Sequence, residues 1–138
     1  MSSWSLAKTN NGWRLPLEDR EINRCIIDYA FSLEFQEGRQ TAVLRIEGDF
    51  TIDDHGHTYR LNPSVLTELG PAVALFGQVV RFARASVEGK LELTFINGRI
   101  LSVDPDACYE AWEMTGPNGT RAVCLPGGTI SVWQPKDA

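Results

Sequence analysis

The chain has 138 residues, 43% of them hydrophobic and 22% charged, which suits one globular domain with its own core. Its net charge of −5 argues against nucleic-acid binding, because that function requires a basic patch. The sequence shows no signal-peptide pattern and no apolar run approaching the ~18 residues of a membrane span. We therefore expect a cytoplasmic protein with no membrane partner, whose three widely spaced cysteines stay reduced.

The polar residues 1–12 predict a flexible arm and 134–138 a polar tail, leaving 13–133 as a single β-rich domain. From Trp13 onward apolar residues recur with period two, which is typical of strands with one buried face. Two stretches show this pattern clearly: Tyr29, Phe31, Leu33 and Phe35 in the first, and Ala42, Leu44 and Ile46 in the second.

One short helix is predicted near residues 63–69. Asn62 suits the N-cap and Pro63 the first helical position, while Gly70 and Pro71 should end the helix. Residues 72–87 fit either a helix with one apolar face or a strand, and periodicity alone does not decide between them.

Two hairpins follow. In 91–103, Asn97-Gly98 suits a type I′ turn, in which both central residues take positive φ, and Leu91, Leu93 and Phe95 should share one face. In 122–133, Pro126-Gly127-Gly128 interrupts two apolar runs and predicts a second hairpin.

An internal repeat is suggested by LEFQEGR (33–39) and LTFINGR (93–99), whose Leu, Phe, Gly and Arg coincide. Upstream, Ile22 aligns with Val80 at an offset of about 58 residues, and on this alignment 78–87 is a strand. The repeat predicts two related antiparallel β-modules, near 13–70 and 71–133, packed as a sandwich or one curved sheet. The alternative is that any two hairpins share such a pattern.

Signals for catalysis or metal binding are weak. The chain has no glycine-rich phosphate loop, and its only histidines are His55 and His57. With Asp54 they form the one local set that could ligate a divalent metal. The favoured interpretation of these residues is a solvated hairpin tip, because a short flexible loop rarely fixes enough metal ligands, so no cofactor is expected.

The stretch YEAWEM (109–114) combines aromatic and acidic residues. On a strand, Glu110 and Glu113 would point to opposite faces and could not form a catalytic pair. Trp112 and Glu110 would share a face, which is either directed into the core or exposed as an aromatic–acid binding surface.

Several motifs in the second half resemble those of an uncharacterised bacterial family, a domain of unknown function. They are Tyr109 to Glu113, Gly116-Pro117, Pro126 to Gly128 and Ile130 to Trp133. Small families of this kind resemble immunity proteins of bacterial toxin systems, and the resemblance implies non-catalytic binding of a protein.

We therefore expect a cytoplasmic binding module whose partner is a basic toxin or a second copy, because an acidic surface favours basic partners. The expected contact residues are Tyr109, Glu110, Trp112 and Glu113. The alternative is a small-molecule or metal-dependent enzyme or sensor whose site is assembled from distant residues.

Overall fold

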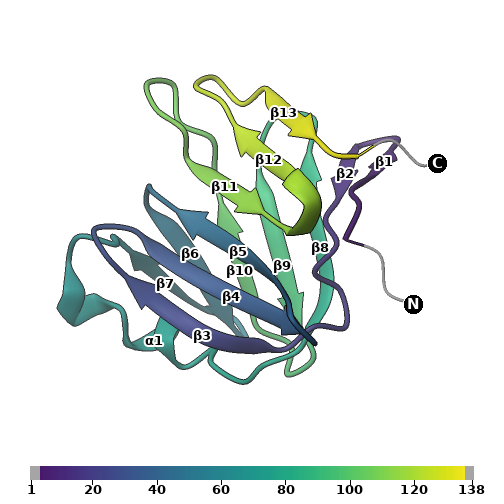
Figure 1. The fold of residues 1–138 in the computed structure, drawn as a ribbon. Helices are drawn as coiled ribbons and strands as arrows, with labels where there is room; N and C mark the ends of the chain where they lie inside the picture. Colours follow the sequence, from purple (N-terminus) through teal and green to yellow (C-terminus); the bar gives the residue numbers. More distant parts are fainter. Residues whose placement is uncertain (1–3, 136–138) are drawn as a thin grey trace.

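The structure, a computed structural model, describes residues 4–135 and consists mainly of two antiparallel β-sheets packed face to face (Figure 1). Sheet A has the order β1 (Ala7–Thr9), β2 (Gly12–Arg14), β8 (Val80–Ser86), β9 (Leu91–Phe95), β10 (Ile100–Val103), β6 (Phe50–Asp54), β7 (His57–Leu61). Sheet B has the order β13 (Ile130–Trp133), β12 (Arg121–Cys124), β11 (Trp112–Thr115), β5 (Gln40–Ile46), β4 (Phe31–Glu37), β3 (Ile22–Ile27). The predicted mainly-β fold is confirmed.

One hydrophobic core fills the space between the sheets, and the period-two pattern explains how it forms. The inward positions of β4, β5 and β9 are at most 1% exposed: Phe31, Leu33, Phe35, Ala42, Leu44, Ile46, Leu91, Leu93 and Phe95. Each large apolar side chain buried in this way stabilises the fold by about 1.5–3 kcal/mol.

Tyr29 is an exception to the predicted pattern. It is 91% exposed and has a φ of 71°, because the chain reverses direction between β3 and β4 at this residue. The prediction that Tyr29 joins the buried face of the following strand is wrong.

The two halves of the chain are interleaved, because each contributes strands to both sheets. Strands β3, β4 and β5 lie in sheet B beside β11 and β12, whereas β8, β9 and β10 lie in sheet A beside β6 and β7. The β3–β4 pairing is irregular between Ile22 and Arg24, and the β8–β9 pairing between Val80 and Phe82. The segment predicted as a strand over 78–87 is β8.

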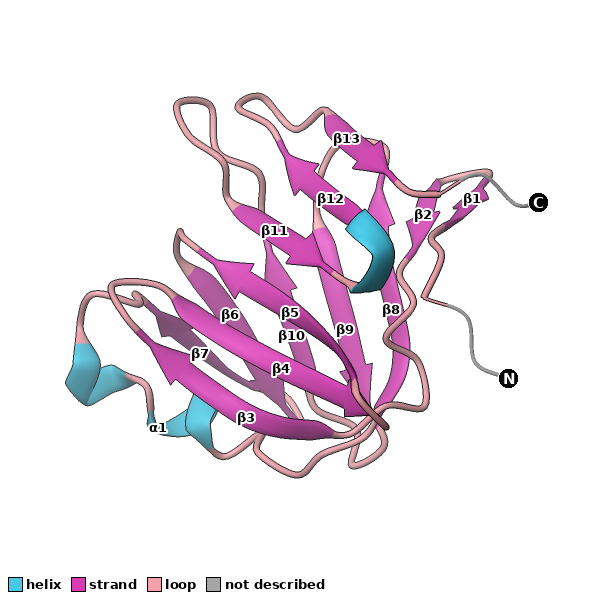
Figure 2. Cartoon of the chain, viewed as in Figure 1, coloured by secondary structure: helices cyan, strands magenta, loops and turns pink. Residues whose placement is uncertain are grey.

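The helical segments lie outside the sheets (Figure 2). Near the predicted helix, Leu66–Glu68 forms a 3-10 turn, η1, and the α-helix α1 follows at Gly70–Val73. Gly70 and Pro71 therefore begin a helix rather than end one, since proline suits the first helical turn. The Asn62 side chain accepts a hydrogen bond from the Ser64 N–H at 2.9 Å and so forms a turn before η1. A second 3-10 turn, η2 (Pro117–Gly119), joins β11 to β12.

The turn between β9 and β10 differs from the predicted type I′. Asn97 does not take a positive φ, whereas Gly98 has a φ of 90° and donates its N–H to the Phe95 carbonyl at 2.9 Å. A two-residue turn with both central φ values positive occurs instead between β6 and β7, at His55 (53°) and Gly56 (96°).

The predicted flexible arm is wrong for residues 4–12, which are packed onto the domain. Trp4 is 7% exposed, donates its indole N–H to Gln40 at 2.9 Å, and stacks on the Arg20 guanidinium at 3.5 Å. Gln134 of the predicted tail exchanges two hydrogen bonds with the Leu6 backbone, at 2.8 and 3.2 Å. Residues 1–3 and 136–138 lie outside the described part of the chain. From Trp4 to Pro135 there is no helix of the length and apolar character that crossing a membrane requires.

Candidate functional site

Trp112 lies in the core, so the Trp112 face of the 109–114 stretch is the buried one. Its side chain is 0% exposed, and its indole N–H donates to the Gly89 carbonyl at 3.0 Å. Met114, two residues on along β11, is also fully buried. Trp112 therefore belongs to the folding core, and its prediction as a partner-contact residue is wrong.

Gly128 packs against Glu88 and Gly89, the segment whose Gly89 carbonyl accepts the Trp112 indole N–H. A Cβ at Gly128 would lie 2.1 Å from the Glu88 carbonyl oxygen, and one at Gly89 would lie 2.5 Å from the Gly128 carbonyl oxygen. Only glycine permits two backbones to approach this closely. The neighbouring Gly127 N–H donates to the Asp106 carbonyl at 2.8 Å, so this turn also anchors the loop between β10 and β11.

That loop forms one wall of a cavity of about 330 Å³. We call this cavity the acidic hollow. Its aromatic lining residues are Phe50 and Tyr109, and its charged lining residues are Asp49, Arg60, Glu68, Asp104 and Asp106. Four carboxylates against one guanidinium leave it with a net negative charge. Such a site favours a cationic group.

Tyr109 is the aromatic wall of the acidic hollow. Its hydroxyl lies so close to Gly48 that a Cβ there would be 2.7 Å away. Partial burial, together with the nearby Asp106 and Asp49 carboxylates, raises the pKa of Tyr109, so the phenol stays neutral and keeps its proton for hydrogen bonding. An aromatic ring beside carboxylates is suited to receive an arginine or lysine side chain.

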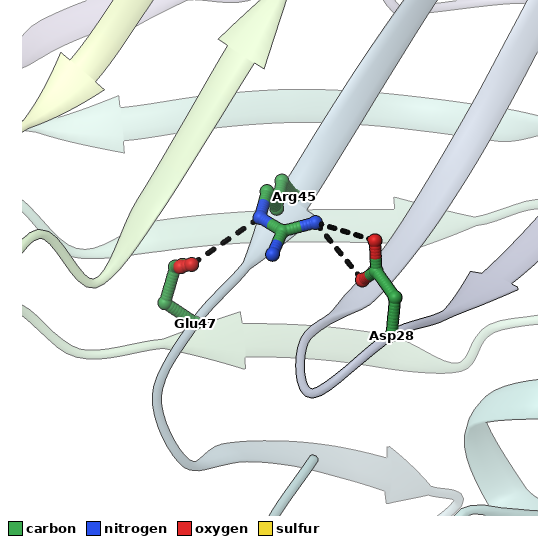
Figure 3. Close-up of polar contacts among 3 residues, drawn as sticks. All are labelled: Asp28, Arg45 and Glu47. Carbon is green, nitrogen blue, oxygen red and sulfur yellow. Dashed lines mark hydrogen bonds and ion pairs between the residues drawn. The ribbon is translucent and has the colours of Figure 1, made fainter. Parts of the chain in front are cut away.

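Asp28, Arg45 and Glu47 form a charged cluster (Figure 3). The cluster adjoins the acidic hollow, because Glu47 directly precedes Gly48 in the lining of that cavity. Arg45 donates to both carboxylate oxygens of Asp28, at 2.9 and 3.1 Å, and to Glu47 at 3.2 Å. Partial burial opposes the charged form, but these two carboxylates outweigh it and raise the pKa of Arg45.

The cluster and the hollow belong to one end of the sandwich. Glu47 precedes Gly48 in the chain and donates its backbone N–H to the Ala111 carbonyl at 2.9 Å. Asp28 precedes Tyr29, the exposed tyrosine of the β3–β4 turn. We call the acidic hollow, this charged cluster, Tyr29 and Glu110 together the acidic end.

The four residues predicted to contact a partner do not form one patch. Tyr109 lines the acidic hollow, and Glu110 is exposed in the same loop because β11 begins only at Trp112. Glu113 lies on the outer face of sheet B, opposite Arg45 across the strand pair, and forms an ion pair with Arg121. Glu110 therefore neither points into the core nor shares a face with Trp112.

The weak metal-ligand candidates Asp54, His55 and His57 instead make contacts with neighbouring side chains. His55 Nδ1 lies 2.7 Å from the Asp54 carboxylate, which Arg99 also approaches at 3.4 Å. The hydrogen bond with His55 and the charge of Arg99 lower the pKa of Asp54. His57 packs edge-on against Tyr59. Within residues 4–135 no three His, Cys, Asp or Glu side chains are grouped so that they could hold a metal ion.

Sequence reasoning missed most of the acidic end, because its parts come from distant loops. Asp28 lies in the β3–β4 turn, whereas Asp49 lies in the β5–β6 connection and Asp104 and Asp106 lie in the β10–β11 connection, both of which cross between the sheets. The available signal was the recurrence of acidic residues in E-G-D (47–49) and D-P-D (104–106), each directly after a buried strand.

A family model matches residues 13–134, which is most of the chain. The chain belongs to DUF6188, a family of unknown function. No curated protein and no solved structure matches it. The DUF6188 match begins at Trp13, so β1, which packs beside β2 at the edge of sheet A, lies before the matched region.

Proposed function

We propose that this protein is a non-catalytic cytoplasmic binding module that captures a basic protein partner through the acidic end. The observation that carries the proposal is the acidic hollow, where four carboxylates and Tyr109 surround a cavity large enough to receive a side chain. Complementary charge would accelerate encounter with a basic partner and fix its orientation.

The exposed aromatics support the same surface. Tyr29 is 91% and Tyr109 45% exposed, and tyrosine is enriched at protein interfaces because it contributes apolar area and a hydrogen-bonding group together. Tyr29 also holds a φ of 71°, which is unfavourable for a side chain other than glycine, asparagine or aspartate. An exposed residue kept in a strained conformation suggests a role outside folding.

Affinity capture from the native host tests the proposal. The charge variant carries Asp49→Asn and Asp104→Asn, whose side chains form no ion pair within residues 4–135. The matched control carries Glu21→Gln and Glu88→Gln, which removes the same charge outside the acidic hollow. We expect the wild type and the control to retain the same basic protein and the charge variant to lose it. Equal retention by all three, or retention of no protein, would contradict the proposal.

We further propose that the partner is a toxin, as the resemblance to immunity proteins implies. Co-expression with the product of a neighbouring gene is the direct test. The neighbouring product should arrest growth alone, and this protein should restore growth, whereas the Asp49→Asn/Asp104→Asn variant should not. A neighbourhood with no growth-arresting gene would refute toxin neutralisation and leave protein binding to be judged by the capture experiment.

A further inference from the structure

A second hollow, of about 340 Å³, lies on sheet A where β1 and β2 meet β8 and β9. Its charge is opposite to that of the whole chain, since Arg14, Arg84 and Lys90 line it together with a single carboxylate, Glu92. We call it the basic groove. It shares no lining residue with the acidic hollow.

The basic side chains of this groove are poorly neutralised by the protein. Within the part of the chain that the structure describes, neither Arg84 nor Lys90 forms an ion pair, and Arg14 reaches only Glu18, at 4.0 Å. The Arg84 guanidinium lies instead over the Phe82 ring, 4.9 Å from its centroid, a contact that restrains its orientation.

Arg14 and Arg84 are also direct partners across the β2–β8 pair. Like charges directly opposite each other destabilise a sheet. The repulsion is compensated only in part, since Glu92 lies opposite Arg84 across the β8–β9 pair and Glu18 lies 4.0 Å from Arg14, while Lys90 adds a further positive charge. An arrangement that costs stability in this way is typical of a functional position. An anion bound between the two guanidinium groups would remove the repulsion.

We propose that the basic groove binds a small organic phosphate monoester. Three cationic groups and Glu92 give a net charge of about +2, which matches the charge of about −1.5 to −2 on a phosphate monoester at pH 7. Guanidinium groups present paired N–H donors that fit phosphate oxygens, and the Lys90 ammonium adds a third cationic donor.

Neutral groups complete the site. Thr9 and Ser86 line the groove together with Trp13 and Ala85. The volume lies at the lower end of the range of small-molecule sites, roughly 300–1,000 Å³. It therefore has room for a compact organic body in addition to the phosphate.

Calorimetric titration with phenyl phosphate tests the proposal. The wild type should bind it saturably, bind inorganic phosphate more weakly, and not bind phenol. Arg84→Gln should weaken binding about tenfold or more, because it removes a charged donor. Arg39→Gln, which removes an equal charge from the exposed β4–β5 turn, should change affinity less than twofold.

A second variant, expected to bind more tightly, keeps the test valid if Arg84→Gln loses binding because it misfolds. Glu92→Gln removes the one carboxylate that lines the groove among residues 4–135 and should tighten binding severalfold. Absence of saturable binding, equal weakening by Arg84→Gln and Arg39→Gln, or no gain with Glu92→Gln would each overturn the proposal. Equal affinity for phenyl phosphate and inorganic phosphate would overturn recognition of the organic body. The acidic end takes no part in these measurements, so their outcome is independent of protein capture.

Discussion

Replacing Gly128 with alanine should destabilise the protein much more than the same change at Gly127. Both glycines have positive φ, 103° and 89°, so either substitution strains the backbone by about 1–3 kcal/mol. The entropy that alanine removes from the unfolded chain is the same at both positions. The surroundings differ, because a Cβ at Gly128 meets the Glu88 carbonyl oxygen at 2.1 Å, whereas one at Gly127 meets nothing within 4 Å.

Relieving that clash requires two backbone segments to move apart, which costs about 1–3 kcal/mol more. Urea unfolding measures the difference, which should appear as a lower midpoint for Gly128→Ala at an unchanged m-value. Gly89→Ala is the reciprocal test, since its Cβ would lie 2.5 Å from the Gly128 carbonyl oxygen. Equal midpoints for Gly127→Ala and Gly128→Ala would refute the argument that close packing of this turn stabilises the fold.

Three further changes have defined outcomes. Trp112→Phe should lower the free energy of unfolding, measured in urea, by about 1–3 kcal/mol, because the Gly89 carbonyl loses its indole donor. A smaller loss would mean that the Cys124 thiol, 3.4 Å from the same carbonyl, suffices as its partner. Tyr109 has a raised pKa in the folded state, so stability should fall as pH rises above about 10. In urea unfolding measured at several pH values in this range, Tyr109→Phe should make the free energy of unfolding fall less steeply with pH, and an unchanged dependence on pH would contradict the prediction. Tyr29→Asn should raise stability by up to about 1 kcal/mol by relieving the positive φ, and a lower melting temperature would refute the strain.

The strands were predictable because alternate residues of a half-buried strand face the core, so apolar residues recur with period two in the sequence. Leu91, Leu93 and Phe95 alternate with polar neighbours, and this pattern is typical of a strand with one buried face. Tyr29 shows the limit of the rule. It lies in phase with Phe31, yet the chain has not entered β4 at that point, and alternation does not mark where a hairpin turns.

Sheet partners and the binding surface were not predictable, because both depend on contacts between distant segments. Nothing local in β5 specifies β11 as its neighbour. The acidic hollow likewise requires Asp49 and Asp104, from two separate crossings between the sheets, to face one cavity. Glu110 was misplaced for a smaller reason, since β11 begins two residues after it.

The internal duplication remains a prediction, and three features of the strand arrangement support it. The first half supplies the meander β3–β4–β5 to sheet B and the hairpin β6–β7 to sheet A, and the second half supplies the meander β8–β9–β10 to sheet A and the hairpin β11–β12, extended by β13, to sheet B. The irregular pairings begin at Ile22 and Val80, which the sequence alignment makes equivalent. The isolated bridge between Glu21 and Val79 joins residues separated by the same offset, as expected if two related halves meet at an approximate two-fold axis.

The motifs around Trp112 and Pro126 to Gly128 stabilise the fold, and they affect the acidic end only by holding its loop in place. Trp112 and Gly128 both contact Glu88-Gly89, while the Gly127 N–H holds the Asp106 carbonyl and thereby the loop that carries Tyr109. Gly128→Ala should therefore weaken partner capture together with stability, although it leaves the charge unchanged. Asp49→Asn/Asp104→Asn should weaken capture while the free energy of unfolding stays within about 0.5 kcal/mol of wild type, since surface substitutions of this kind change stability little. If Gly128→Ala lowered stability without affecting capture, the turn would support only the core, and the position of Tyr109 would have to depend on Gly48 and Asp106 alone.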